Sequence, residues 1–498
     1  MKVTWVTIAL VAGCGGASDV PEDTGSSKEA ERDAAWAALV EDVDGWLDYD
    51  SAVGLGFAVV LDGELAYSAG MGVTQYGGGV PVNPDTVFRW NSVSKFHTAL
   101  AVMQLVEAGH LDLDAPATEL LPELSLSGAY SASELTLHRM MTHTSALPDF
   151  WITNCDVELD DLWQTWSPSL EVEPGKLFNY SNAGWSLAGR LVEVASGESF
   201  NDYIQENVLA PAGMETATFD VDEAISGLNY TFGYDGVFYT PDIHDCPYVR
   251  PAGWLHASPL DLGRMAEVML AGGRGLVSES SVDEITEMLF ETGYASGSSY
   301  GYGLYTWEHG GVKLLGHMGG GAGHLSYFMM APDQGFAVVA ASNTSFFSPY
   351  VIAERAADLF LEQDDDWVAP EEYTEPASWS EYVGTYEDPI NVGTIVVSLN
   401  EDEKLYVRFE DGSNTERRLY QYANDEFFYE YDGYVYIRFA RDPESGDVRF
   451  FANRYFVGDQ ESVSENDLSP NSAEQIAEIL REGAELELRG PEHRPGPR

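Results

Sequence analysis

A helix-length stretch in the first quarter of the chain is apolar on every side. From Ala99 to Val106 only Gln104 interrupts the apolar residues, which predicts a helix buried all round. Lys95 lies one turn before this run, and Ser92 lies one turn before Lys95, on the same helix face. A lysine drawn into an apolar interior loses hydration, and a desolvated lysine can act as a base toward a neighbouring serine.

Alternating apolar positions at both ends of the first 360 residues predict strands. Residues 54–73 read as two strands joined by an Asp62-Gly63 turn, and strands return between residues 300 and 342. The region between them has helical patterns, and a further amphipathic helix is expected at the start; these helices cover Glu29–Leu47, Leu135–Thr142, Leu187–Ala195 and Leu260–Leu270. The pattern predicts an α/β domain over residues 33–363, in which one antiparallel sheet carries an inserted helical lobe.

The pattern changes after an acidic, proline-bearing linker at residues 364–378. Residues 379–460 consist of short aromatic-rich strands separated by polar turns, which predicts a small antiparallel β-barrel. The last segment, residues 461–498, should hold a helix over Ala473–Leu488 and a loose tail.

Charge narrows the class of partner. The chain has 25 basic and 82 acidic residues, a net charge of −57, so a nucleic-acid partner is excluded for want of a basic surface. The acidity runs through the whole length, which favours a role in solubility.

The N-terminus is typical of an exported protein. One lysine precedes a short apolar segment, and the small residues Ala12 and Gly13 stand directly before Cys14. This ending resembles a bacterial lipobox, in which Cys14 would be lipidated after removal of a signal peptide over residues 1–14. Residues 15–32 would then be a tether, and the protein would be held at the bacterial cell envelope by its lipid alone.

Two further cysteines remain, Cys155 and Cys246. In an exported protein such a pair can be bridged, and the spacing alone leaves a disulfide and two buried thiols equally open.

Two more motifs accompany the serine and lysine. Tyr180-Ser181-Asn182 precedes a helical pattern, and His317-Met318-Gly319-Gly320 lies at a strand end. In order and spacing the three motifs resemble the serine beta-lactamase-related family, which includes class C beta-lactamases, DD-peptidases, D-aminopeptidases and esterases. The resemblance runs from about Ala35 to Leu361 and is supported by four further blocks: "DLDAPA", "LTLHRMMTHTSALP", "VLAPAGMETATF" and "PAGWLHASPLDLGRM". The C-terminal barrel resembles the lipocalin-like domain of some members.

The resemblance implies a role for each residue. Ser92 would be the acylated nucleophile, Lys95 its proton partner and Tyr180 the shared general acid and base. Asn182 would orient Lys95 or the substrate, while His317, Gly319 and Gly320 would line the opposite strand, with the Gly320 N–H as an oxyanion donor. The substrate would be a small ester or a D-amino-acid peptide, with no metal or organic cofactor. The same cleft could also belong to a silent member that only binds cell-wall peptide.

Three alternatives compete with this assignment. Gly297–Gly301 matches a nucleophile elbow around Ser299, but a loop is expected there rather than the strand and helix that an elbow needs. Tyr422 and Asn424 repeat the second motif inside the barrel, and His309 repeats the third at a turn.

The histidine at 317 departs from members that hydrolyse beta-lactams, which commonly hold a lysine there to bind the substrate carboxylate. This favours the peptidase and esterase branches over a true beta-lactamase. A charged Lys95 nearby would lower the pKa of His317, and we expect a neutral imidazole that bonds Tyr180 or the substrate.

Overall fold

The computed structural model describes residues 25–364 and 379–459, with short gaps at 50–52, 150–154, 166–167, 171, 228, 236–237, 240–244, 293–297, 322, 389–392, 401–402, 410–415, 424, 430–431, 442–444, 454–455. Cys14, nearly all of the linker and the C-terminal helix and tail lie outside the described residues. The first helix, α1 (Gly25–Tyr49), begins inside the segment predicted as a tether, so residues 25–32 are helical instead.

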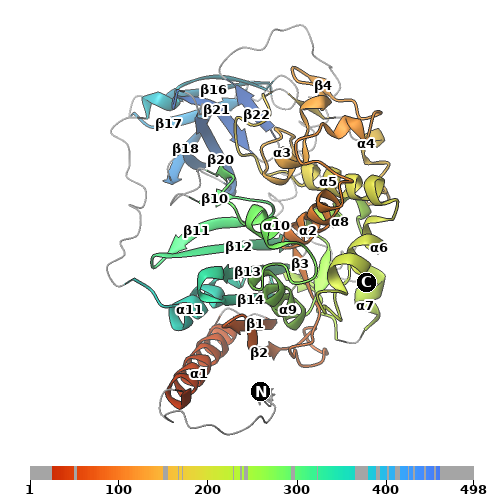
Figure 1. The fold of residues 1–498 in the computed structure, drawn as a ribbon. Coiled ribbons are helices and arrows are strands. Elements are labelled where there is room, and N and C mark those ends of the chain that lie inside the picture. Colours follow the sequence, from red (N-terminus) through yellow and green to blue (C-terminus); the bar gives the residue numbers. More distant parts are fainter. Residues whose placement is uncertain are drawn as a thin grey trace, which may run out of the picture.

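An eight-stranded antiparallel sheet organises the first part of the chain (Figure 1). Its strand order is β2-β1-β14-β13-β12-β11-β10-β9, so the two ends of the domain meet where β1 pairs with β14. This confirms the predicted large antiparallel sheet. Its strands are β1 (Gly54–Leu61), β2 (Glu64–Gly72), β9 (Phe290–Glu291), β10 (Ser299–Tyr300), β11 (Tyr305–His309), β12 (Val312–Gly321), β13 (His324–Ala331) and β14 (Phe336–Ser342).

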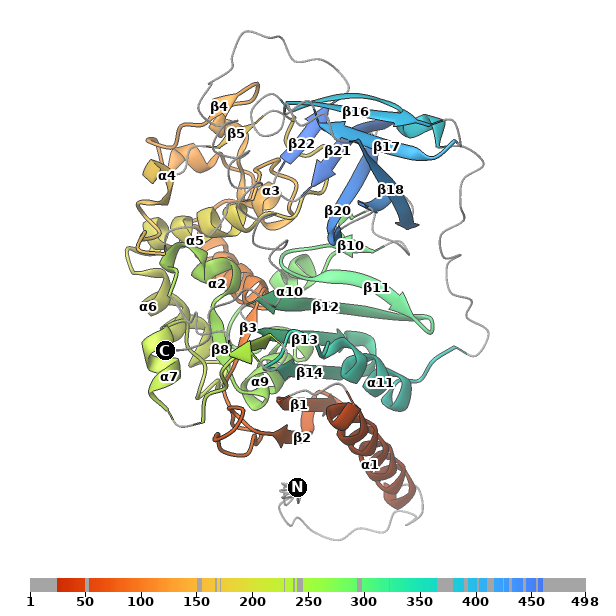
Figure 2. The same ribbon diagram turned by 180° about the vertical axis from the view of Figure 1, so that it is seen from behind.

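Helices cover both faces of the sheet, because β1 is apolar on both sides. Leu55, Phe57 and Val59 pack into one core cluster with α1 and α11 (Tyr350–Phe360), as Figure 2 shows from behind. Ala58 and Val60 point the other way, into the larger cluster that contains the buried helix α2 (Ser94–Glu107). The all-apolar pattern of residues 99–106 therefore correctly predicted that α2 is buried in the core.

The segment between β2 and β9 forms the helical lobe. Its short strands pair as β3 (Phe88–Asn91) with β8 (Leu255–Ala257), β4 (Ser127–Gly128) with β5 (Ser169–Leu170), and β6 (Tyr234–Asp235) with β7 (Phe238–Tyr239). Its helices are α3 (Leu137–Met141), α4 (Leu162–Thr165), α5 (Asn182–Ser196), α6 (Phe200–Ile204), α7 (Val221–Ser226), α8 (Arg250–Gly253), α9 (Pro259–Leu270) and α10 (Glu279–Ile285). Cys155 and Cys246 are joined by a disulfide that ties two parts of this lobe, 91 residues apart.

The C-terminal strands pair in chain order, and the last returns to the first, where Glu387 lies opposite Asp459, so they form a closed barrel. Its described inward side chains fill it, among them Tyr386, Phe439 and Phe451, each at most 1 % exposed. The strands are β15 (Gly384–Asp388), β16 (Gly393–Leu399), β17 (Leu405–Phe409), β18 (Glu416–Ala423), β19 (Glu426–Tyr429), β20 (Asp432–Arg441), β21 (Val448–Asn453) and β22 (Phe456–Asp459).

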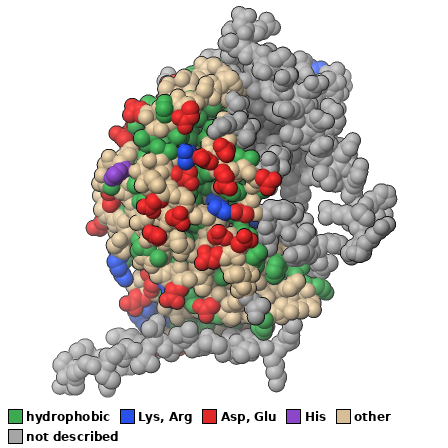
Figure 3. Space-filling view, turned by 90° about the vertical axis from the view of Figure 1, so that its right-hand side faces the viewer, with side chains coloured by type: hydrophobic (Ala, Val, Ile, Leu, Met, Phe, Trp, Pro, Cys, Tyr) green, Lys and Arg blue, Asp and Glu red, His purple; other side chains and the backbone are tan. Residues whose placement is uncertain are grey.

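The surface carries the charge that composition predicted. Carboxylates are spread over the described face shown in Figure 3, with few lysines and arginines among them. Within the described part of the chain, no helix has both the length and the apolar composition needed to cross a bilayer.

Candidate active site

Ser92 lies in the turn that connects β3 to α2. Ser94 holds this turn in place, since its Oγ donates to the carbonyl oxygen of Asn91 at 2.6 Å and accepts the N–H of Leu255 at 2.9 Å. The helix itself begins at Ser94, so Ser92 stands just before the helix rather than inside its first turn. The Lys95 N–H still bonds the Ser92 carbonyl, at 3.1 Å, which sets the two side chains on one side.

The amine of Lys95 is fully buried and has three polar neighbours. Its Nζ lies 3.2 Å from Ser92 Oγ, 2.8 Å from Asn182 Oδ1 and 2.7 Å from the Ala252 carbonyl oxygen. The last two oxygens can only accept, so they engage two N–H groups. Of these three partners, the Ser92 hydroxyl is the one that can also give up a proton.

Tyr180 reaches the same serine from the helical lobe. Its hydroxyl donates to Ser92 Oγ at 2.8 Å, and its ring centroid lies 4.8 Å from Lys95 Nζ. The ring also stacks on His143, with 4.2 Å between centroids. Tyr180 stands two residues before Asn182, the first residue of α5. The N-terminal end of this helix therefore presents both the Tyr180 hydroxyl and the Asn182 amide to the site.

Asp149 was not predicted, and it orients Asn182. Its carboxylate, 5 % exposed, accepts the Asn182 backbone N–H at 2.8 Å and the amide Nδ2 at 3.2 Å. Because a carboxylate accepts, the amide nitrogen faces it, and the amide oxygen is left to face Lys95. The only signal in the sequence is that Asp149 directly follows the "HTSALP" block.

His317, on β12, has the predicted neutral charge, and of its two expected partners, Tyr180 and the substrate, the structure tests only Tyr180. It is 2 % exposed, and burial, followed by the charge of Lys95, lowers its pKa to about 3, so the imidazole is neutral. Its Nε2 lies 3.0 Å from the Tyr300 hydroxyl, and its Nδ1 bonds the Met318 carbonyl. Tyr180, one of the two expected partners, makes no such bond, because the two imidazole nitrogens bond Met318 and Tyr300; the Tyr180 and His317 ring centroids are 6.2 Å apart. Tyr300, another residue that sequence reasoning missed, is fully buried.

Gly319, one of the two predicted glycines, lets β12 approach β3, the strand that leads into the turn with Ser92. A Cβ at Gly319 would overlap the Trp90 carbonyl oxygen and the Ser326 hydroxyl, so no other residue permits this contact. Gly320 follows on the exposed side of the strand. The structure therefore brings Ser92, Lys95, Tyr180 and Asn182 into direct contact, with His317, Gly319 and Gly320 on the adjoining strand.

The competing residues lie elsewhere. Ser299 is in strand β10 between β9 and β11, so the predicted loop is wrong, and no helix follows it as an elbow requires. His309 pairs with Asp358 at 2.9 Å. Tyr422 belongs to β18 of the barrel, and Asn424 is outside the described residues.

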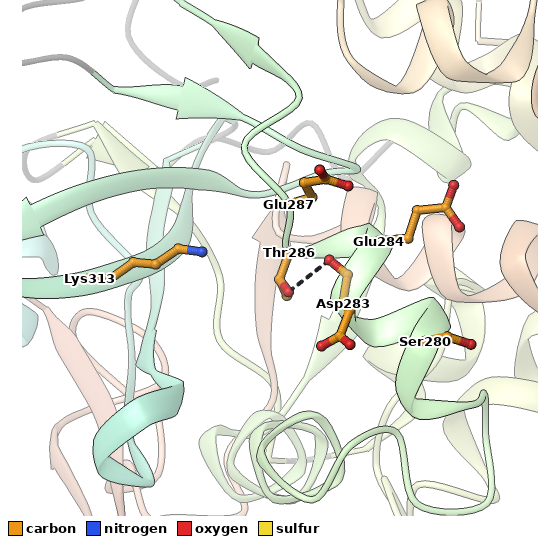
Figure 4. Close-up of a pocket in the computed structure, with 6 residues that line it drawn as sticks. All are labelled: Ser280, Asp283, Glu284, Thr286, Glu287 and Lys313. Carbon is orange, nitrogen blue, oxygen red and sulfur yellow. Dashed lines mark hydrogen bonds between the residues drawn. The ribbon is translucent and has the colours of Figure 1, made fainter.

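A separate hollow of about 530 Å³ lies between α10 and β12 (Figure 4). Its lining is mainly carboxylates and hydroxyls, and the dashed bond in the figure joins the Thr286 hydroxyl to the Asp283 carbonyl oxygen. It contains no serine paired with a base, and the catalytic candidates are not among its lining residues: Ser280, Asp283, Glu284, Thr286, Glu287 and Lys313.

Known proteins resemble the chain over the same regions. A family described as Beta-lactamase matches residues 39–362, and a Domain of unknown function (DUF3471) matches residues 369–457. Penicillin-binding protein 4 of Amycolatopsis lactamdurans is 28 % identical over 67 % of this chain and 93 % of its own length. Esterase EstB of Burkholderia gladioli is 34 % identical over 34 % of this chain and 47 % of its own.

Solved structures share the fold. A crystal structure of SurE with D-Leu superposes with a TM-score of 0.67 at 23 % identity, covering 87 % of this chain and 100 % of its own. An octameric penicillin-binding protein homologue from Pyrococcus abyssi gives 0.60 at 22 % identity, covering 85 % and 99 %.

Proposed function

Because the chain belongs to the beta-lactamase family, we propose that it is an exported serine hydrolase that forms an acyl-enzyme on Ser92. The observation that carries this proposal is the position of the Ser92 hydroxyl, within reach of both Lys95 Nζ (3.2 Å) and the Tyr180 hydroxyl (2.8 Å). A nucleophile touching two groups that can exchange protons is the arrangement that covalent catalysis needs. Relatives named as a penicillin-binding protein and an esterase support the hydrolase class.

The proposed reaction uses the groups in contact with Ser92. Its Oγ attacks the carbonyl carbon of an ester or amide, and its proton passes to whichever of Tyr180 and Lys95 holds none. The same proton then goes to the leaving alcohol or amine as the carbonyl–leaving-group bond breaks. Water hydrolyses the resulting ester of Ser92 by the reverse sequence. The backbone N–H groups of Ser92 and Gly320 are the proposed donors to the oxyanion.

The proposed substrate is a small ester or a D-amino-acid peptide rather than a beta-lactam. His317 is neutral and buried against Tyr300, so it offers no cation to a substrate carboxylate. A panel of acyl esters, D-amino-acid peptides and a chromogenic cephalosporin tests this directly. Turnover of the cephalosporin at a rate equal to or above that of the esters would assign a true beta-lactamase instead.

Labelling tests the nucleophile. A fluorophosphonate should add one adduct to the chain, and peptide mapping should place it on Ser92. Ser92→Ala should abolish labelling, while Ser299→Ala should keep it. No adduct on the wild-type chain would favour a silent protein that only binds cell-wall peptide, and an adduct on Ser299 would overturn the assignment.

We also propose that a lipid on Cys14 anchors the enzyme to the bacterial cell envelope. The support is the sequence alone, in which small residues precede Cys14 after an apolar segment. Cys14→Ala should move the protein from the membrane fraction to the soluble fraction with its labelling intact. Retention of that variant in the membrane fraction would rule out the anchor.

A further inference from the structure

Residues 143–149 form the loop that follows α3. Side chains of this loop contact three consecutive residues of the site, Tyr180–Asn182. His143 stacks on Tyr180 and accepts the Ser181 N–H on Nδ1 at 2.9 Å. At the other end of the loop, Asp149 accepts both donors of Asn182. The position of this loop therefore determines where the Tyr180 hydroxyl and the Asn182 amide stand.

The loop has a strained backbone in the middle. Ala146 has φ of 59° and His143 has φ of 58°, both in the left-handed region. For a residue with a Cβ this conformation costs roughly 1–2 kcal/mol, so neighbouring contacts must stabilise it. Ala146 stands three residues from both His143 and Asp149, and it is 7 % exposed.

A barrel residue packs in the same apolar cluster as Ala146. Phe450, on β21, forms one apolar cluster with Ala146, Val172 and Leu177 of the lobe. Figures 1 and 2 show the strands β21 and β22 at the same end of the molecule as α3, the helix that leads into the loop. The contact therefore joins the C-terminal barrel to the segment that holds Tyr180.

Phe450 does not belong to the interior of the barrel. Its neighbour Phe451 packs in the barrel core, and successive side chains of a strand point to opposite faces. Phe450 is nonetheless fully buried, so the catalytic domain is what covers it. Truncating Phe450 removes the contact between domains without hollowing the barrel.

We propose that Phe450 is a positioning residue of the active site, through which the barrel holds loop 143–149, and with it Tyr180, in the geometry that acylation of Ser92 requires. This inference rests on the proposed function. It makes the C-terminal domain a structural part of the catalytic centre.

The test measures the rate of fluorophosphonate labelling in the full chain. A displacement of about 1 Å at a catalytic group can cost roughly 10²-fold, so Phe450→Ala should slow labelling about 10- to 100-fold. Phe450→Leu, which keeps an apolar contact, should recover most of the rate. Tyr406→Ala, a half-buried aromatic on β17 outside this cluster, should label like the wild type.

A combined variant separates positioning from a general loss of structure. In a background that carries both Tyr180→Phe and Asn182→Ala, the two groups that the loop positions are gone, so adding Phe450→Ala should slow the residual labelling less than threefold. The same 10- to 100-fold factor in both backgrounds would show that Phe450 acts on the whole fold, and would overturn the inference. A Phe450→Ala chain that labels at the wild-type rate would overturn it too, while leaving Ser92 as the nucleophile. Absence of wild-type labelling would instead defeat the proposed function.

Discussion

The two sides of the site solve the problem of burying polar groups in opposite ways. On the Lys95 side the amine keeps three polar neighbours, and one of them is the candidate nucleophile. On the His317 side the imidazole gives up its charge and uses both nitrogens on protein groups, Tyr300 and the Met318 carbonyl. Lys95 is therefore placed to exchange protons with Ser92, whereas His317 is placed to stabilise the structure around the site.

The largest expected effect on the labelling rate comes from removing the Lys95 amine. Lys95→Met should lower the rate of Ser92 labelling by at least roughly 10³-fold, since groups that act as one catalytic unit fail together. His317→Asn should lower it less than about tenfold. Lys313→Met, on the outer part of β12, is the matched control and should have no effect. Equal losses in the Lys95 and His317 variants would contradict the division of roles.

A charge placed on the His317 side should cost stability instead of improving function. His317→Lys puts a cation into a site that is 2 % exposed and already close to Lys95, so the free energy of unfolding should fall by several kcal/mol, of order 3. Met318→Lys puts the same cation on the neighbouring side chain, which is 56 % exposed, and should leave stability nearly unchanged. Urea unfolding measures both, and equal stability in the two variants would refute the contrast.

The orientation of Asn182 can be tested through Asp149. Asp149→Asn replaces an acceptor of two bonds with a group that also donates, so the Asn182 amide loses its fixed orientation toward Lys95. We expect the labelling rate to fall roughly tenfold, equivalent to one charge-assisted hydrogen bond. Asp358→Asn, at an exposed pair with His309, serves as the control. An unchanged rate in Asp149→Asn would show that Asn182 needs no such support.

The smallest effect is a dependence of stability on pH. Burial lowers the pKa of His97 and His317 to about 3, and that of His256 well below its usual value. In the unfolded chain each titrates near 6.5, so below that pH the unfolded state binds more protons and folded stability falls with pH, down to about 3. Each histidine contributes at most about 1.4 kcal/mol per pH unit.

His317→Asn should reduce the dependence of the free energy of unfolding on pH by the contribution of one histidine. Urea unfolding at pH 7 and pH 5.5, on the wild type and the variant, gives the two slopes. Because burial and the charge of Lys95 lower the pKa of His317 to about 3, an acid limb of kcat/KM above pH 5 would belong to another group. If the slopes agree, His317 is not a buried neutral group.

Much of the site could be predicted from short patterns. Ser92 and Lys95 meet because a three-residue spacing at the start of a helix sets two side chains on one face, and the apolar run after them predicts burial. The apolar alternation predicted the large sheet, because periodicity reports which sides of a strand are covered. Residue spacing and apolar periodicity depend only on neighbouring positions in the chain, so they can be read from the sequence.

Other features depended on segments that meet only in the folded chain. Asp149 lies 33 residues from Asn182, and the Ala252 carbonyl lies 157 residues from Lys95, so no spacing predicts either contact. His317 illustrates the division most clearly. The charge of the nearby Lys95 predicted from the sequence that the pKa of His317 is lowered, and the structure adds burial as the larger cause. Only the tertiary structure decided its partner, because Tyr300 comes from β10, which is separated from β12 by β11, and its hydroxyl bonds the imidazole Nε2.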